Sequence, residues 1–318
     1  MELGRVGVVL PGGGCKCAFQ AGALRFLVEN KIAPEKVQGV SGGALNAAKF
    51  VENGVDSLEQ VWRDVERIGP KAVFTGNMTW NIVNFKPALY TDDGLLRLVN
   101  QLDMRKIVSS PIKFEVVVWN ELTELQEVFY NGDFNQDIFS QERFRRIIKA
   151  SSSMPGFFNP EKLDEDHIYS DGCVFSLKTF ADLDSIFVID TSQQHIPSDY
   201  SKSASFKRMM KRFSTMIDHS GFEAIETFVR THKYRVMPED ESKPPLLLRG
   251  YKEAFNDFQG GFGEFLKGLI GLPVRRLVVI SPEINIETLM LDSFKPGDIS
   301  HSIEHGYQCA EEVFKLLE

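Results

Sequence analysis

The stretch Gly39-Val40-Ser41-Gly42-Gly43 constrains the fold of this chain more than any other. It follows a strand-like run and precedes the helix-like residues 44–50, so that a serine stands on a sharp turn between a strand and a helix. Glycines two residues before and after the serine permit such a turn, which exposes the hydroxyl. Small residues also cluster at strand–helix turns for packing reasons alone, so the pattern makes Ser41 a candidate nucleophile and leaves the packing explanation open.

A glycine loop follows the first predicted strand. Residues 5–10 are apolar and rich in β-branched side chains, and Gly12, Gly13 and Gly14 come directly afterwards at the start of a helical stretch. Consecutive glycines let backbone N–H groups converge at a helix N-terminus, which favours an anion. The phosphate-binding motif G-x-x-x-x-G-K-[ST] is absent, and Cys17 stands where G-x-G-x-x-G requires its third glycine. The loop therefore suits the oxyanion of acyl transfer better than a nucleotide.

Four blocks together resemble, in order and spacing, the patatin-like phospholipases. They are the P-G-G-G-C-K-C loop at 11–17, G-V-S-G-G at 39–43, A-S-S-S-M-P-G-F-F at 150–158 and S-D-G at 170–172. The resemblance covers about the first two thirds of the chain. It implies an α/β fold with a central, mainly parallel sheet and helices on both faces. It also implies a serine–aspartate dyad without a histidine, in which Ser41 is the nucleophile and Asp171 activates it.

The same resemblance implies roles for the residues around the dyad. The backbone of Gly12, Gly13 and Gly14 forms the oxyanion hole, and the supporting positions are Lys16, Gly39, Gly43 and Gly172. The chain departs from the family pattern at Cys17, where glycine is usual. A cysteine forced to a positive φ there would be strained, which would alter the shape of the oxyanion hole.

Asp171 by itself is a weak signal. It closes a short predicted strand and opens an Asp-Gly pair, which is among the commonest turn dipeptides. A carboxylate is also a weaker general base at neutral pH than an imidazole. The assignment of Asp171 therefore depends on the other three blocks.

The resemblance implies a lipid acyl hydrolase of the phospholipase A, lysophospholipase or esterase type, which cleaves fatty-acyl esters through an acyl-enzyme without metal or organic cofactor. Two alternatives stay open. One is a non-catalytic module that binds lipids or anions. The other is a Ser-His-Asp α/β-hydrolase that uses Asp190 with His301 or His195. Against the latter, the serine turn here follows the second strand, whereas an α/β-hydrolase reaches its serine only after several strands.

Charge and hydropathy limit the partners and the location. The net charge of −8 argues against nucleic acid, which normally requires a basic surface. No apolar run approaches the roughly 18 residues of a membrane span. The chain enters a strand at once without a secretory leader pattern, which predicts a cytoplasmic protein and leaves peripheral membrane contact open. The sequence gives no indication of oligomeric state.

Cysteines and histidines give no metal pattern. Cys15, Cys17, Cys173 and Cys309 show neither a disulfide framework nor paired C-x-x-C motifs, which indicates reduced thiols. His301 and His305 lie four residues apart on a predicted helix but lack the glutamate of H-E-x-x-H. We therefore expect surface histidines and no metal site.

We expect one domain over residues 1–318. Its core comprises about 1–195 together with the final strand and helix at 275–318, and a helical extension covers about 200–272. Within this extension, 205–218 has the pattern of an amphipathic helix, which suits core packing or a lipid surface. Residues 251–272 alternate phenylalanines with glycines, which suits a mobile flap over an acyl groove or a packed cap.

Periodicity predicts the remaining elements. A helix over 57–68 has Ser57 as its expected N-cap. Residues 76–90 are irregular and aromatic, which favours packing against the core over a place in an acyl-chain pocket. Further strands are expected at 114–119, 124–130, 185–190 and 276–280, and further helices at 92–102, 140–150 and 300–317.

Overall fold

The computed structural model describes residues 3–84, 86–191, 225, 228, 235–237, 275–282 and 294–317. Within these residues a nine-stranded sheet has the order β5-β6-β3-β2-β1-β7-β9-β8, with β4 paired to β3. The strands are β1 (Val6–Leu10), β2 (Lys36–Gly39), β3 (Lys113–Asn120), β4 (Leu125–Tyr130), β5 (Glu161–Lys162), β6 (Ile168–Asp171), β7 (Ser185–Ile189), β8 (Arg235–Met237) and β9 (Arg276–Ile280).

Most of the sheet is parallel. β1 pairs in parallel with β2 and β7, β2 with β3, and β9 with both β7 and β8. The antiparallel pairs are confined to one side, where β4 and β6 pair with β3, and β5 pairs with β6. The predicted α/β fold class, with a mainly parallel sheet, is confirmed.

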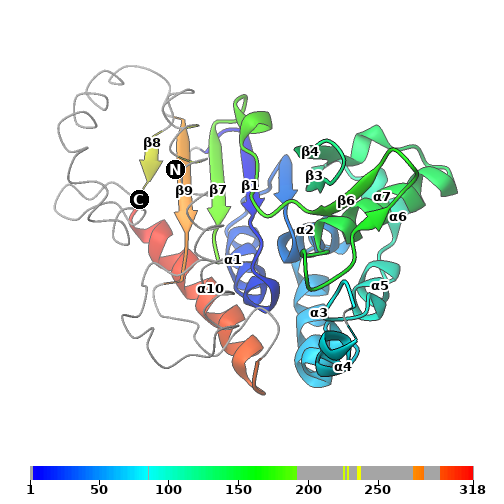
Figure 1. Cartoon of the computed structure of the whole chain (residues 1–318). Helices are drawn as coiled ribbons and strands as arrows, with labels where there is room; N and C mark the ends of the chain where they lie inside the picture. Colours follow the sequence, from blue (N-terminus) through cyan, green and yellow to red (C-terminus); the bar gives the residue numbers. More distant parts are fainter. Residues whose placement is uncertain are drawn as a thin grey trace, which may run out of the picture.

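Helices cover the sheet, as Figure 1 shows. Those in the described residues are α1 (Ala18–Glu29), α2 (Gly42–Asn53), α3 (Val55–Ile68), α4 (Met78–Val83), α5 (Asp93–Asn100), α6 (Met104–Val108), α7 (Ile138–Ser151) and α10 (Asp298–Lys315). The same part of the chain contains short 3₁₀ helices at Gly14–Cys17, Pro70–Ala72, Asn131–Asp133 and Lys178–Phe180.

Strand side chains alternate between two apolar cores. Val8 and Leu10 of β1 join the larger core with residues of α1, α2, α3, α7 and α10. Val9 points to the other face, where the segment around Phe180 and the helical residues Ile225 and Phe228 cover the sheet. Because strand side chains alternate, a strand buried on both faces reads as a continuous apolar run. This arrangement explains the uninterrupted apolar sequence of the first strand.

α1 and α10 lie side by side, and two glycines allow their close contact (Figure 1). A Cβ atom on Gly22 would lie 1.7 Å from the carbonyl oxygen of Ile303, and one on Gly306 would lie 2.0 Å from that of Phe19. Any larger side chain would force the helices apart, so these glycines fix the closing helix against the first one.

The structure differs from the sequence expectations at several elements. α3 begins at Val55 after Gly54, which has a φ of 79°, so Ser57 lies inside the first turn and the predicted N-cap is wrong. Residues 76–90 contain a short helix, α4, that the sequence did not indicate. The short strands β5 and β8 and helix α6 were also not predicted. The candidate lipid-contact segments at 205–218 and 251–272 lie outside the described residues.

Among the helices that the structure describes, none combines the length and the apolar character required to cross a bilayer.

Candidate active site

The register of the sheet places the end of β2 next to the end of β6. Gly39, the last residue of β2, pairs with Val116 of β3. Asp171, the last residue of β6, pairs with Val118, two residues further along the same strand. β2 ends before the turn at Ser41, and antiparallel β6 then takes its place beside β3. The two segments therefore deliver Ser41 and Asp171 to one point at the edge of the sheet.

Ser41 stands in a backbone conformation that is unusual for a residue with a side chain, with φ 56° and ψ −130°. Such geometry costs about 1–3 kcal/mol and persists only when the surroundings enforce it. Its neighbours are glycines for steric reasons. A Cβ on Gly39 would lie 2.4 Å from the carbonyl oxygen of Gly43, and one on Gly43 would lie 2.1 Å from that of Leu10. One on Gly12 would lie 2.9 Å from the Cβ of Ser41.

The three serines at the C-terminal end of α7, Ser151, Ser152 and Ser153, contact both dyad candidates. The Ser41 N–H donates to Ser151 Oγ at 3.0 Å, and Ser152 Oγ donates to the Ser41 carbonyl at 2.9 Å. The carbonyl of Ser153 accepts a hydrogen bond of 3.1 Å from the Asp171 N–H. One short segment therefore holds the backbone of both Ser41 and Asp171.

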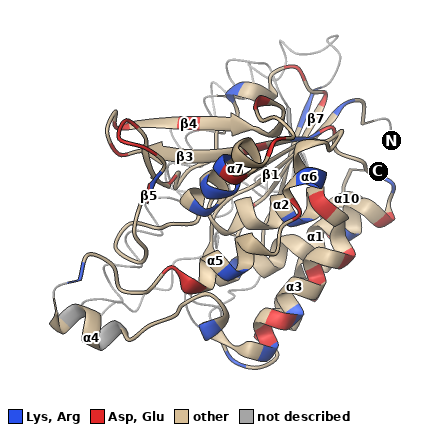
Figure 2. Ribbon diagram, turned by 90° about the vertical axis from the view of Figure 1, so that its right-hand side faces the viewer, with Lys and Arg blue, Asp and Glu red and all other residues tan. Residues whose placement is uncertain are grey.

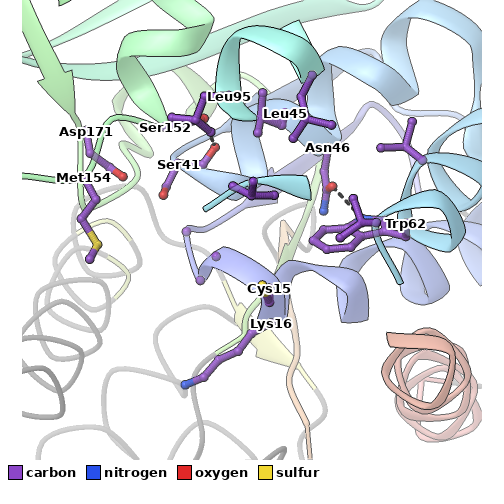
Figure 3. Close-up of a pocket in the computed structure, with 18 of the residues that line it drawn as sticks. Cys15, Lys16, Ser41, Leu45, Asn46, Trp62, Leu95, Ser152, Met154 and Asp171 are labelled. Atoms are coloured by element: carbon purple, nitrogen blue, oxygen red, sulfur yellow. Dashed lines mark hydrogen bonds between the residues drawn. The ribbon is translucent and has the colours of Figure 1, made fainter. Parts of the chain in front are cut away.

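Asp171 is buried, and its carboxylate faces Ser41 (Figure 3). Burial raises the pKa of Asp171 to about 6, although hydrogen bonds from the Ser41 side chain and the Cys173 N–H act in the opposite direction. The Cys173 N–H lies 2.9 Å from Asp171 Oδ1. Gly172 is required between them, since a Cβ there would lie 2.7 Å from the carbonyl oxygen of Val117.

The glycine loop has its carbonyls bound by the protein. The Thr191 hydroxyl donates to the Gly12 carbonyl at 2.7 Å, and the Lys16 N–H donates to the Gly13 carbonyl at 3.1 Å. Among the described residues, no acceptor is found for the N–H groups of Gly13 and Gly14. Both glycines line the same cavity as Ser41, so this loop has the geometry of an anion-binding backbone.

Cys17 does not carry the strain that a positive φ would impose. Its φ is −64° and its ψ is −9°, in the ordinary helical region. The thiol is buried 3.8 Å from the Pro11 carbonyl oxygen, and burial raises the pKa of Cys17. The cysteine therefore acts as a small packing residue under the loop. Lys16 extends away from the Ser41 hydroxyl in Figure 3.

A cavity of about 140 Å³ contains Ser41 and Asp171 and continues between the helices (Figure 3). Its walls are mainly apolar side chains from α2, α3, α5 and the segments around 73–74 and 154–158. These apolar residues are Leu45, Leu58, Val61, Trp62, Val65, Val73, Phe74, Leu95, Leu98, Leu102, Met154, Phe157 and Phe158. Ser41, Asp171 and the glycine loop belong to the same lining, which also includes the polar residues Asn46, Lys49 and Gln101. The mainly apolar walls suit a ligand with one reactive polar group and an apolar chain.

The described histidines do not contribute to this cavity. His167 lies 2.6 Å from Asp164, and neither it, His301 nor His305 is among the lining residues. His301 is exposed as expected, but His305 is buried against Phe19, so the prediction of a surface position is wrong for His305. Within the described parts of the chain, no group of three His, Cys, Asp or Glu side chains could hold a metal ion. His195, His219 and His232 lie outside these parts.

The serine block was expected near the site, but the hydrogen bonds of the Ser151, Ser152 and Thr191 side chains were not predicted from the sequence. Thr191 had one available signal, because it follows the strand Ser185–Ile189 at the edge where the carboxyl ends of parallel strands meet. Gln20 was also missed. It is a buried glutamine inside an apolar helix, and its amide donates to the carbonyls of Pro11 and Ile189 at 2.7 and 3.2 Å.

Comparison with known proteins gives one family match. Residues 8–184 match the sequence profile of Patatin, the patatin-like phospholipases. No curated protein matches the chain by sequence. Among solved structures, twelve chains match, including the crystal structure of VipD from Legionella pneumophila. VipD shares 12% sequence identity with a TM-score of 0.45, over 99% of this chain and 67% of VipD.

Proposed function

Because the chain belongs to the patatin-like phospholipase family, we propose that it hydrolyses carboxylic esters of lipids with Ser41 as nucleophile and Asp171 as general base. One observation supports this assignment above the others. The Ser41 hydroxyl and the Asp171 carboxylate interact in a mainly apolar cavity, beside the N–H groups of Gly13 and Gly14, for which the described part of the chain provides no acceptor.

In the first half of the reaction Asp171 accepts the proton of Ser41 Oγ while this oxygen bonds to the ester carbonyl carbon. The carbonyl oxygen becomes an oxyanion, which the N–H groups of Gly13 and Gly14 stabilise. The carbon–oxygen bond to the alcohol then breaks, and the alcohol leaves with the proton from Asp171. Ser41 remains as the fatty-acyl ester.

In the second half a water molecule enters. Asp171 accepts its proton as the water oxygen attacks the acyl carbon, and the same loop again holds the oxyanion. The bond to Ser41 Oγ breaks, Ser41 recovers the proton, and the fatty acid leaves.

The environment of Asp171 explains how a carboxylate can act as the base. A general base works best when its pKa lies near the working pH. Burial raises the pKa of Asp171 to about 6, above its ordinary value of 3.8. The carboxylate is therefore still ionised at neutral pH but binds a proton more strongly than an exposed aspartate does.

The cavity supports a fatty-acyl group as the bound part of the substrate. Apolar side chains of α2, α3 and α5 line it beyond Ser41, and transfer of an acyl chain from water to such walls gains about 0.8 kcal/mol per CH₂ group. Phospholipids, lysophospholipids and glycerides all present such a chain next to an ester carbonyl.

The direct test measures fatty-acid release from phosphatidylcholine, lysophosphatidylcholine and a medium-chain p-nitrophenyl ester. Ser41→Ala and Asp171→Asn should each lose at least about a thousandfold in kcat. His301→Ala is the control, because His301 is exposed on α10 and does not line the cavity. Full activity in Ser41→Ala would refute the proposal. A well-folded parent that binds lipid but hydrolyses none of the substrates would indicate the non-catalytic module instead.

A further inference from the structure

We propose that Ser151 and Ser152 are positioning residues that hold the strained nucleophile in place and set it against the base. The inference rests on the proposed function and assigns to these two side chains a role that the reaction steps do not contain. Neither side chain takes part in bond making or proton transfer.

Ser151 acts on the N–H side of Ser41. A hydroxyl has one proton to donate, and Ser151 Oγ donates it to the Val117 carbonyl at 2.7 Å. Its lone pairs are then available to the Ser41 N–H at 3.0 Å. Val117 lies on β3 between Val116 and Val118, which pair with the ends of β2 and β6. Ser151 therefore ties the nucleophile to the strand that also positions Asp171.

Ser152 acts on the carbonyl side. Its hydroxyl lies 2.9 Å from the Ser41 carbonyl oxygen and 3.5 Å from that of Ile148, so the bond to Ser41 is the shorter one. The Ser41 carbonyl also accepts from the Ala44 N–H at 2.9 Å, in the first turn of α2. With the peptide groups on both sides of Ser41 bound, its φ of 56° cannot relax without breaking buried hydrogen bonds.

Ser153 provides an internal control. Its backbone carbonyl accepts from the Asp171 N–H, but the bond of its side chain among the described residues goes to the Lys149 carbonyl at 3.1 Å. Ser153→Ala removes a buried hydroxyl from the same segment and leaves both dyad contacts intact. Its effect therefore measures the general cost of a lost hydroxyl at this place.

The test compares Ser151→Ala, Ser152→Ala and Ser153→Ala by kcat and KM for a soluble p-nitrophenyl ester, by the rate of fluorophosphonate labelling, and by melting temperature. Ser151→Ala and Ser152→Ala should lower kcat and the labelling rate about 10- to 100-fold with KM within about twofold, because a positioning defect affects the transition state more than substrate binding. Ser153→Ala should stay within about threefold. Ser152→Thr keeps the donor next to the cavity and should recover most of the rate.

The positioning role is refuted if all three alanine variants lose the same amount of rate, or if the loss is in KM alone. Labelling of Ser41 in the parent chain tests the proposed function separately. If the parent is not labelled, the proposed function fails. If the parent is labelled and the three variants behave alike, only the positioning role fails.

A second, independent inference concerns residues 75–91, which we call the α4 loop. We infer that this loop contacts the lipid surface from which the proposed enzyme takes its substrate. Trp80 and Val83 on α4 are 63% and 66% exposed, respectively, and Figure 2 shows α4 projecting away from the sheet. Trp side chains favour the boundary between water and the acyl region of a bilayer.

The loop is joined to the wall of the cavity. Thr75 and Thr91 bridge its two ends, and the N–H groups of Leu89 and Tyr90 donate to the carbonyls of Gly156 and Phe157 at 3.0 and 2.9 Å. The neighbouring rings of Phe74, Tyr90, Phe157 and Phe158 pack against one another. A lipid surface in contact with α4 would therefore lie next to the aromatic wall of the cavity.

The charges of this region complement lipid phosphates. The chain carries 44 acidic residues, yet residues 68–91 contain none and include Lys86 in the α4 loop and Lys71 four residues before it. Lys71 and Lys86 are exposed. An acidic protein is repelled by an anionic surface except where such a stretch faces it, so the charge pattern favours approach through the α4 loop.

The test uses the Ser41→Ala chain, in which hydrolysis cannot alter the vesicles, and measures sedimentation with vesicles of phosphatidylcholine and phosphatidylglycerol. Adding Trp80→Ala should weaken vesicle binding about tenfold, because the exposed ring no longer transfers from water into the lipid surface. Adding Lys71→Glu and Lys86→Glu should weaken it further at low salt. Trp119→Ala, on β3, is the matched control and should bind as the parent does.

Failure of the parent to bind vesicles, or equal binding by the Trp80 and Trp119 variants, refutes the lipid contact. Hydrolysis of a soluble short-chain ester, measured with Ser41 present, reports on the proposed function independently. Trp80→Ala should leave that rate unchanged because Trp80 does not line the cavity.

Discussion

The Thr191 hydroxyl donates a hydrogen bond of 2.7 Å to the carbonyl oxygen of Gly12. This contact joins Thr191, two residues beyond the end of β7, to the glycine loop after β1, and β1 and β7 are paired strands. It turns the Gly12 carbonyl toward the protein. A carbonyl aimed into the site would repel an oxyanion, so the orientation of the peptide groups in this loop decides whether the N–H groups can bind one.

Thr191→Val should therefore lower kcat about tenfold with little change in KM. Valine keeps the shape of threonine but leaves the Gly12 carbonyl without its donor. Steady-state kinetics on a soluble ester measures the effect. Thr123→Val, which removes a hydroxyl in the exposed turn between β3 and β4 and outside the cavity lining, is the control. Equal rates for Thr191→Val and the parent would show that Thr191 does not orient the loop.

The pH dependence should report the ionisation of Asp171. Because the carboxylate must be ionised to accept the proton of Ser41, kcat/KM should rise with pH and reach half its plateau near the pKa of about 6. Stopped assays with an ester whose own hydrolysis is slow across this range would measure the profile. A midpoint near 4, the value of an exposed aspartate, would contradict the burial argument.

Burial of the ionised Asp171 carboxylate should also lower the free energy of unfolding at neutral pH. In the folded chain its pKa of about 6 exceeds the ordinary value of 3.8, so the folded state binds the proton more tightly. This tighter proton binding adds roughly 3 kcal/mol to the free energy of unfolding. The contribution is fully present below about pH 4 and is lost as the pH rises through about 6.

Asp171→Asn should therefore be inactive yet more stable than the parent at pH 8, with the difference shrinking toward pH 4. Denaturant unfolding at the two pH values measures this. Asp166→Asn, at an exposed position, should change little. A variant that is less stable than the parent at pH 8 would indicate that the carboxylate hydrogen bonds outweigh its desolvation.

Trp62 should limit the length of the bound acyl chain. It lines the cavity and is fixed by a hydrogen bond of 3.0 Å from its indole N–H to Asn46 Oδ1. Trp62→Ala should shift the preferred substrate toward longer chains in a series of p-nitrophenyl esters, at a cost of about 3–5 kcal/mol of stability. Trp62→Phe keeps most of the wall and should shift the preference less. An unchanged optimum in both variants would place the acyl chain elsewhere.

The fold was predictable because its signals are local. The runs that became β1, β7 and β9 are apolar throughout or after one polar first residue, as strands buried on both faces require. β5 has two residues, and α4 and α6 have six and five. Elements this short carry too few residues for a periodic pattern, and tertiary contacts decide their existence.

The candidate site was likewise predictable only where its signals are local. The glycines around Ser41 could be identified from the sequence, because neighbouring backbone atoms come too close there for any residue with a Cβ atom. Ser151 and Ser152 contact the turn at Ser41, and Thr191 contacts the glycine loop. Each of these contacts joins segments more than a hundred residues apart in the chain. The surface position predicted for His305 is wrong for a related reason. Its ring packs against Phe19, and helical spacing alone does not reveal this contact.

Covalent labelling is the most direct test of whether Ser41 is an activated nucleophile. A fluorophosphonate probe reacts with the purified chain, and mass spectrometry of the digest locates the modified peptide. We expect modification at Ser41, loss of labelling in Ser41→Ala, and a strongly reduced labelling rate in Asp171→Asn. No labelling of a well-folded parent, with or without lipid vesicles, or labelling at another serine that persists in Ser41→Ala, would contradict it.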